Sequence, residues 1–283
     1  MSNNPLSKYF RKPAMYVTLP TNGLFNPEID KTILDEVPIL PMTALDEISL
    51  QNPDALLNGE ALINVIKSCV PSIPNPRKLC NIDAESLFLA IQYASSGKDI
   101  EHTHQCTECD AVTDYKVDLN QLMNRFPDIK EIPVVEHEGI KIYISPATVE
   151  SVTRLSLMDI ERKKILLEIE SSVSDEDPDG DMELAKRFYQ SFNKIVQHNV
   201  SLLTEAIYKI ETEDGEIVTD KAFIDEFMFN IPGKVVDKIN QIAVQLSKKP
   251  DDSNLLKFTC PECGNVDEVN IEVNPINFSI AGS

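Results

Sequence analysis

The stretch Cys106-Thr-Glu-Cys109, and a second one of the same form, Cys260-Pro-Glu-Cys263-Gly264, decide how this chain folds. Each cysteine pair lies between segments with the pattern of β-strands, so each predicts a β-hairpin with the cysteines at its tip. Two such hairpins brought together place four thiolates around one tetrahedral position, which is the geometry of structural zinc. We therefore predict one structural Zn²⁺ per chain, with Cys106, Cys109, Cys260 and Cys263 as its ligands.

The two pairs lie much farther apart than the about 15–20 residues of a compact zinc module. The metal would therefore join segments on either side of a large insertion. The alternatives are a redox dithiol and a plain turn without a ligand. A redox Cys-x-x-Cys usually opens a helix in a βαβ unit, and no helical pattern follows either pair. A catalytic zinc is not expected, because four thiolates leave no position for water.

Two histidines leave the ligand set open. His102 and His104 alternate with Cys106 along one predicted strand, so the three side chains point to the same face. Either histidine could replace a cysteine as a ligand. The other two cysteines, Cys69 and Cys80, have no partner at ligand spacing, and we predict that both pack in the core.

Length and charge limit the classes of function. A chain of 283 residues can form one large domain or two modest ones with a sizeable core. The net charge of −20 argues against binding to nucleic acid, which requires clustered Lys and Arg. No apolar run is as long as a membrane span, and the first residues lack a signal-peptide pattern. We therefore expect a protein of a reducing cytoplasm, in which cysteines stay as thiols or bind metal.

The order of the patterns predicts an α+β fold. Zinc-ribbon-like, four-cysteine β-hairpins would close an α/β body. Two long helices, one from Thr148 to about Ser171 and one from about Met182 to Ile207, would form an inserted helical hairpin lobe. The expected divisions are a flexible leader at 1–14, the α+β body with the first cysteine hairpin at 15–146, the helical insertion at 147–250, and the second cysteine hairpin, final strand and tail at 251–283.

Local signals place the ends of the shorter helices. Thr43 is expected to cap a helix that runs through Leu50, and Asp83 to cap the clearest helix of the chain, which Gly97 ends. A further short helix is expected from Leu119 to Phe126.

No pattern of catalytic residues stands out. The four histidines do not form an H-E-x-x-H motif, and the chain has neither a G-x-S-x-G elbow nor a Gly-rich phosphate loop. We therefore expect a protein that is not an enzyme. The competing hypothesis is a metal-dependent hydrolase that uses His102, His104 and nearby acids.

Four segments follow one another along the chain. They are Val17-Thr-Leu-Pro-Thr-Asn-Gly, Ile39-Leu-Pro-Met-Thr-Ala-Leu-Asp-Glu, Leu57-Asn-Gly-Glu-Ala-Leu, and the run from Lys78 to Gly97 that leads into the first cysteine pair. Taken in this order, they resemble the T4-type bacteriophage baseplate hub assembly proteins. The resemblance covers residues 15–125 well and the rest loosely. Within the run from Lys78 to Gly97, Gln92 stands where the family pattern has Arg, and Ser95-Ser96 where it has Thr-Tyr.

This resemblance implies a role and no reaction. It implies a late phage protein, a chaperone or structural component, that binds baseplate hub proteins while a contractile tail is assembled in the host cytoplasm. Such a protein is found in the virion if it stays in the finished baseplate. The alternative function is a zinc-ribbon adaptor that binds host or phage transcription or replication machinery.

Overall fold

The computed structural model describes residues 5–52, 55, 59–172, 186, 189–190, 192, 203–247 and 256–269, and these form two compact units. Unit 1 comprises Met1–Glu131 together with Lys248–Ser283, and unit 2 comprises Ile132–Ser247. Unit 2 is thus an insertion in the sequence of unit 1. The helical insertion predicted over 147–250 overlaps unit 2 up to Ser247, and unit 2 also contains the strand pair at 134–144.

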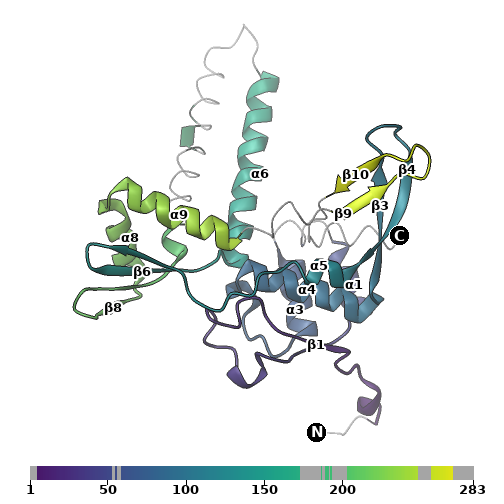
Figure 1. Ribbon diagram of the computed structural model, residues 1–283, viewed down its shortest axis with the longest axis horizontal. Coiled ribbons are helices and arrows are strands. Elements are labelled where there is room, and N and C mark those ends of the chain that lie inside the picture. Colours follow the sequence, from purple (N-terminus) through teal and green to yellow (C-terminus); the bar gives the residue numbers. More distant parts are fainter. Residues whose placement is uncertain are drawn as a thin grey trace. The chain divides into compact units, whose positions relative to one another are not determined.

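Unit 1 combines helices with three separate antiparallel strand pairs (Figure 1). The strands pair as β1 with β2, β3 with β4, and β9 with β10. In chain order its elements are η1 (Ser7–Tyr9), β1 (Met15–Val17), η2 (Lys31–Ile33), β2 (Val37–Ile39), α1 (Ala44–Leu50), α3 (Glu60–Cys69), η3 (Pro76–Lys78), α4 (Asn81–Ser96), β3 (Asp99–Gln105), β4 (Val112–Asp118), α5 (Leu119–Met123), β9 (Leu256–Thr259) and β10 (Val266–Val269).

Helix α1 begins as its sequence predicts. The Thr43 side chain accepts a hydrogen bond from the N–H of Asp46, and the Asp46 carboxylate accepts one from the N–H of Thr43. This reciprocal pair is a capping box, which satisfies two backbone donors that the first helical turn would otherwise leave unpaired.

Helix α4 is the central helix of unit 1, and our prediction of its start was wrong. The N-cap is Cys80, which makes no side-chain capping bond, and the helix begins at Asn81. Asp83 lies inside the first turn, where its fully buried carboxylate accepts hydrogen bonds from the N–H (2.9 Å) and the hydroxyl (2.5 Å) of Thr21. A long-range contact therefore occupies the carboxylate that a local rule assigned to capping. The short helix α5 also ends earlier than expected, at Met123.

The N-terminal segment is anchored at Arg11. Its guanidinium donates to the carbonyl oxygens of Pro41 (2.7 Å) and Ser68 (2.6 Å) and lies 3.3 Å from the carboxylate of Asp46. The N–H of Ala14 then donates to the carbonyl of Ile39, which continues the pairing of β1 with β2. Within the flexible leader predicted at 1–14, Arg11 and Ala14 are therefore bonded to the rest of unit 1, and residues 5–10 are exposed.

Unit 2 contains a four-stranded antiparallel sheet in the order β5-β6-β7-β8. The hairpin between β5 and β6 turns at Glu138-Gly139, and both of these residues have positive φ, as a two-residue hairpin loop requires. In chain order the elements are β5 (Val134–His137), β6 (Ile140–Ile144), α6 (Val149–Ser172), β7 (Ile207–Glu211), β8 (Ile217–Val218), α8 (Lys221–Asn230) and α9 (Gly233–Ser247).

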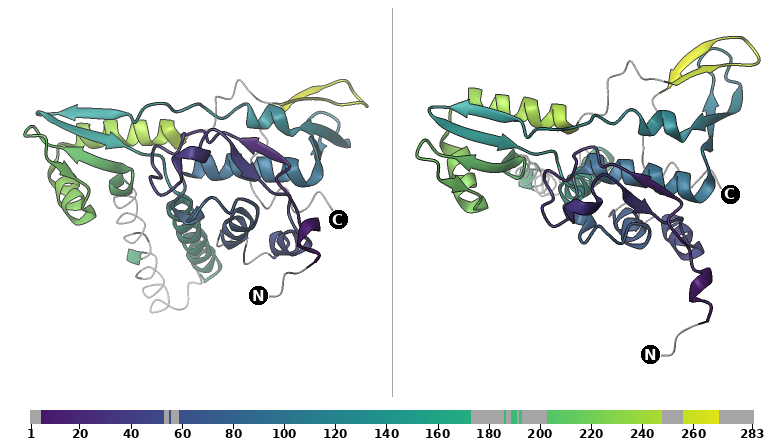
Figure 2. Two further views of the ribbon diagram at one scale, coloured as in Figure 1. Left: turned by 90° about the horizontal axis from the view of Figure 1, so that it is seen from below. Right: turned by 60° about the horizontal axis from the view of Figure 1, so that its bottom comes forward.

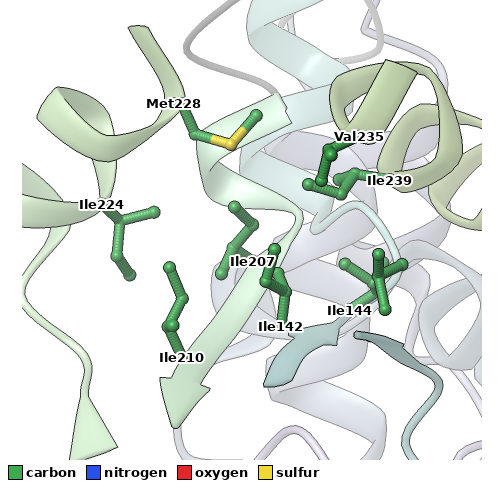
Figure 3. Close-up of a cluster of buried hydrophobic side chains, with 9 residues drawn as sticks. Ile142, Ile144, Ile207, Ile210, Ile224, Met228, Val235 and Ile239 are labelled. Atoms are coloured by element: carbon green, nitrogen blue, oxygen red, sulfur yellow. The ribbon is translucent and has the colours of Figure 1, made fainter. Parts of the chain in front are cut away.

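Helices α8 and α9 form the core of unit 2 with the sheet. In Figure 3, Ile224 and Met228 of α8 and Val235 and Ile239 of α9 surround the side chains of the strands. The strand side chains of this cluster are Val135, Ile142, Ile144, Ile207 and Ile210. Alternate residues of β5 and β6 enter this core because successive side chains of a strand point to opposite faces.

Helix α6 extends away from the sheet of unit 2 (Figure 1). Its first turn is held by polar contacts: the Ser151 hydroxyl donates to Glu205, and Arg154 forms an ion pair with the same carboxylate at 3.0 Å. The Lys221 ammonium donates to the carbonyl oxygens of Thr204 (3.0 Å) and Ile207 (2.8 Å) nearby. The partner helix that we predicted from about Met182 to Ile207 lies largely outside the described residues.

The structure is therefore a mixed α+β protein, as predicted. Unit 2 differs from the mostly helical insertion that we expected, because it is organised around its own sheet. None of the helices in the described residues is long and apolar enough to cross a membrane.

Candidate metal centre

The two cysteine pairs lie at the tips of two β-hairpins with the same backbone pattern. In the first, the N–H of Cys106 donates to the carbonyl of Ala111 (2.9 Å), and the N–H of Asp110 donates back to Cys106 (3.0 Å). In the second, Cys260 donates to Asn265 (2.8 Å), and Gly264 donates back to Cys260 (3.0 Å).

Each tip requires a left-handed residue directly after its second cysteine. Asp110 has φ of 58° and Gly264 has φ of 75°. Gly adopts this conformation without strain, and Asp is among the few other residues that tolerate it. The two sequences therefore form equivalent turns.

The four sulfur atoms lie together although the pairs are far apart in the chain. The Sγ of Cys106 is 3.7 Å from that of Cys263, and the Sγ of Cys109 is 3.6 Å from that of Cys260. All four lie within 4.8 Å of one another, which is close enough to bind one metal ion. The structure thus brings together the four residues that we predicted as ligands.

The two hairpins lie side by side in both views of Figure 2, and aromatic side chains pack between them. The rings of Tyr115 on β4 and Phe258 on β9 stack with centroids 4.3 Å apart. Phe258 is buried with Leu89, Val117 and Leu122, so the second hairpin also joins the core around α4 and α5. The Tyr115 hydroxyl donates to the carbonyl of Thr259 at 3.1 Å.

Asp267 on β10 connects the second hairpin to the first. One carboxylate oxygen lies 2.8 Å from Nε2 of His104 and accepts from the N–H of Thr107 (3.1 Å). The other accepts from the Thr107 hydroxyl (2.5 Å) and from the Asn265 amide (2.8 Å). The Thr107 and His104 contacts lower the pKa of the Asp267 carboxyl to about 2, so this carboxylate is charged at neutral pH.

The electrostatics of the cluster favour a bound cation. Backbone N–H groups of Glu108 and Cys109, directed at the sulfur of Cys106, lower the pKa of this thiol to about 7. The N–H of Ala111 acts in the same direction on Cys109, but the neighbouring thiols, Cys263 first among them, raise the pKa of Cys109 to about 12. The hairpin tips therefore stabilise one thiolate, and further thiolates repel one another unless a cation lies between them.

The histidines do not belong to this cluster. Among the described residues, the group close enough to hold one ion is the four cysteines. His104 contacts Asp267, and His102 packs against Phe258 with ring centroids 5.7 Å apart. The burial of β3 alternates as predicted, with His102 and His104 on its less exposed face, but Asp267 and Phe258 of the other hairpin contact the two rings there.

The two remaining cysteines are buried, as predicted. Burial raises the pKa of the Cys69 thiol to about 11 and also raises that of Cys80. Cys69 also lies 3.6 Å from the Arg11 guanidinium, a contact that the sequence does not indicate.

These features define a mixed α+β protein in which two hairpins from distant parts of the chain join at a four-cysteine cluster. The model of the T4 bacteriophage base plate protein family matches residues 34–277, which is most of the chain, and the chain belongs to this family. The match confirms the resemblance found in the sequence and extends it through unit 2 and the second cysteine pair. Membership indicates a structural or assembly role in a phage baseplate, with other baseplate proteins as the expected contacts.

Comparison with curated proteins gave no match, and comparison with solved structures gave none either.

Proposed function

We propose that this chain is a non-enzymatic tail assembly protein that binds subunits of the baseplate central hub. It does so while a contractile tail is assembled in the cytoplasm of the infected cell. The observation that carries the proposal is the match to the T4 base plate family over residues 34–277. An acidic chain with net charge −20 and no catalytic motif in its sequence suits a protein that works through contacts with other proteins.

The four-cysteine cluster holds a structural Zn²⁺ in this proposal. A tetrahedral zinc with Zn–S bonds of about 2.3 Å separates its ligands by about 3.8 Å, and the two distances between the hairpins are 3.6 and 3.7 Å. Zinc in such a site joins the hairpins into a zinc ribbon and supplies no reactive position, because four thiolates complete its coordination.

The first experiment measures where the protein is found and what it binds. Quantitative mass spectrometry compares its abundance in infected-cell lysate and in purified particles, and affinity capture on purified hub subunits tests the contact directly. We expect retention on at least one hub subunit. Copies in the particle indicate a structural component, whereas abundance in the lysate alone indicates a chaperone. Retention on a polymerase and on no hub subunit would replace this proposal with the adaptor function.

The metal is tested separately. We expect elemental analysis to give about one zinc per chain, and Cys106→Ser with Cys260→Ser to abolish zinc binding and lower the melting temperature. Cys80→Ala is the matched control, because this buried thiol lies outside the cluster. If the double variant kept both its metal and its melting temperature, the shared site would be wrong.

A further inference from the structure

The N-terminal segment differs in charge from the rest of the chain. Residues 1–14 contain Lys8, Arg11 and Lys12, and none of the 46 acidic residues of the chain. The same segment carries two neighbouring aromatic residues, Tyr9 and Phe10, which are 73% and 59% exposed. A basic, aromatic segment at the surface of a protein with net charge −20 requires an explanation.

This segment is held in place by Arg11. Besides its bonds to backbone carbonyls, Arg11 donates to the Ser68 hydroxyl (2.7 Å) and pairs with Asp46 of α1. Because Arg11 is used in this internal contact, the charges that remain at the surface are those of Lys8 and Lys12, both exposed. The Lys8 ammonium lies 4.9 Å from the centre of the Tyr9 ring, so a charge and an aromatic face are presented together.

Helix α1 extends the exposed apolar surface. Its Leu45 and Ile48, one turn apart, are 72% and 62% exposed. The contact of Arg11 with Asp46 joins the N-terminal segment to α1. We call the exposed residues of the two elements the N-terminal patch; they are Lys8, Tyr9, Phe10, Lys12, Leu45 and Ile48.

We propose that the N-terminal patch is a docking surface for another baseplate protein, whose contact surface is an apolar groove lined by Asp and Glu. The inference rests on the proposed function. Apolar side chains of this size fill pockets at the centre of interfaces, and the two lysines pair with carboxylates at the rim. Acidic surfaces are repelled by most of this chain, so the basic N-terminal segment is where such a partner can approach.

Two other occupants fit the patch less well. Nucleic acid requires denser Lys and Arg than two exposed lysines supply, and it makes little use of Leu45 and Ile48. A second copy of this chain also carries a net charge of −20, so long-range repulsion opposes self-association through a small patch.

The experiment uses the full chain with zinc bound and each of the other baseplate proteins of the same phage, produced together and purified. For each complex, biolayer interferometry compares the wild-type chain with two variants. We expect Tyr9→Ala with Phe10→Ala to weaken binding at least about 30-fold. We expect Lys8→Glu with Lys12→Glu to slow association about tenfold.

Matched controls come from unit 2. Phe223→Ala with Phe229→Ala removes two phenylalanines that are 64% and 72% exposed, and Lys234→Glu with Lys238→Glu makes the same change of charge on α9. Both control variants are expected to bind the partner within about twofold of wild type. Equal losses in patch and control variants would overturn the proposal.

Carbodiimide coupling, which joins a lysine to a carboxylate in direct contact, tests the chemistry of the partner. We expect Lys8 or Lys12 to couple to Asp or Glu of the partner, as mapped by mass spectrometry. Coupling within a homodimer, or patch-dependent binding of a single-stranded oligonucleotide, would overturn the proposal. If the chain bound no baseplate protein, the proposed function itself would fail. If it bound one while the patch variants bound equally well, the docking surface alone would be wrong.

Discussion

The Asp83 carboxylate is fully buried in unit 1, and both of its hydrogen bonds come from Thr21. Burial raises the pKa of this carboxyl from 3.8 to about 6, although the bonds from Thr21 act in the opposite direction. Because the folded-state pKa lies above the unfolded value, the favourable contribution of Asp83 is complete below about pH 4 and is lost as the pH rises through about 6.

Asp83→Asn should therefore change how stability depends on pH. Asn cannot titrate, and its amide can still accept from the N–H of Thr21. From pH 4 to pH 7 we expect the unfolding free energy of the wild-type chain to fall relative to that of the variant, by up to about 3 kcal/mol. Urea unfolding of both proteins at each pH measures this, and taking the difference between them removes effects that they share, such as loss of metal in acid.

Asp83→Ala serves as the comparison for the hydrogen bonds. It leaves the N–H of Thr21 without its acceptor. Because Ala and Asn both lack a titrating group, we expect the unfolding free energy of Asp83→Ala to lie about 1–3 kcal/mol below that of Asp83→Asn at every pH. A difference between wild type and Asp83→Asn that stayed constant from pH 4 to pH 7 would show that Asp83 does not titrate in this range.

Among the elements, the two cysteine hairpins are joined by Asp267 as well as by sulfur. Its carboxylate accepts bonds from Thr107 and contacts His104, both on the first hairpin. Because Thr107 directly follows Cys106, these bonds fix the turn that carries two of the four sulfur atoms. Residues that position a metal site from outside the ligand set typically contribute 10–100-fold to metal affinity. Asp267→Asn keeps the size of the side chain but loses an acceptor oxygen, and we expect zinc to bind about 10–100-fold more weakly.

Competition with a chromophoric chelator measures this affinity. Glu268→Gln is the control, because Glu268 is exposed and pairs with Lys257, which is on the same hairpin. We expect the control to bind zinc as the wild type does. Equal affinities of Asp267→Asn and Glu268→Gln would mean that Asp267 does not contribute to metal binding.

Features set by neighbouring residues could be predicted from the sequence, and features set by distant ones could not. The Thr43 cap and each cysteine turn depend on a few adjacent residues, and the structure contains all of them. The contact of Asp267 with His104 spans 163 residues, and no local pattern specifies it. For the cysteines, the preference of zinc for four thiolates supplied the long-range link that strand patterns lack.

The same reasoning accounts for the errors. Asp83 satisfies the local rule for an N-cap, but its carboxylate is hydrogen-bonded to Thr21, 62 residues earlier, and does not cap the helix. The sequence does not indicate the sheet of unit 2, because residues 145–206 separate β6 from β7 in the chain. Pairing across such a gap depends on the burial of Ile142 and Ile210 in one core, which a single sequence does not display.

At the scale of the whole molecule, the four-cysteine cluster and the core of unit 2 belong to different compact units. Removal of metal should therefore expose the backbone of the cysteine hairpins while the sheet of unit 2 stays protected. Ile142→Ala should expose the sheet of unit 2 while the cysteine hairpins stay protected. The substitution leaves a cavity in the core of unit 2 and lowers the free energy of unfolding by about 2–5 kcal/mol.

Hydrogen exchange read by mass spectrometry distinguishes the two cases peptide by peptide. After chelation we expect faster exchange in Asp99–Asp118 and Leu256–Val269, and in Ile142→Ala faster exchange in Val134–Ile144 and Ile207–Val218. Val244→Ala is the control for Ile142→Ala. This side chain of α9 is 46% exposed, so its removal should change the free energy of unfolding little. If chelation and Ile142→Ala each accelerated exchange throughout both units, the chain would unfold as one cooperative body, and the independence of the two units would be wrong.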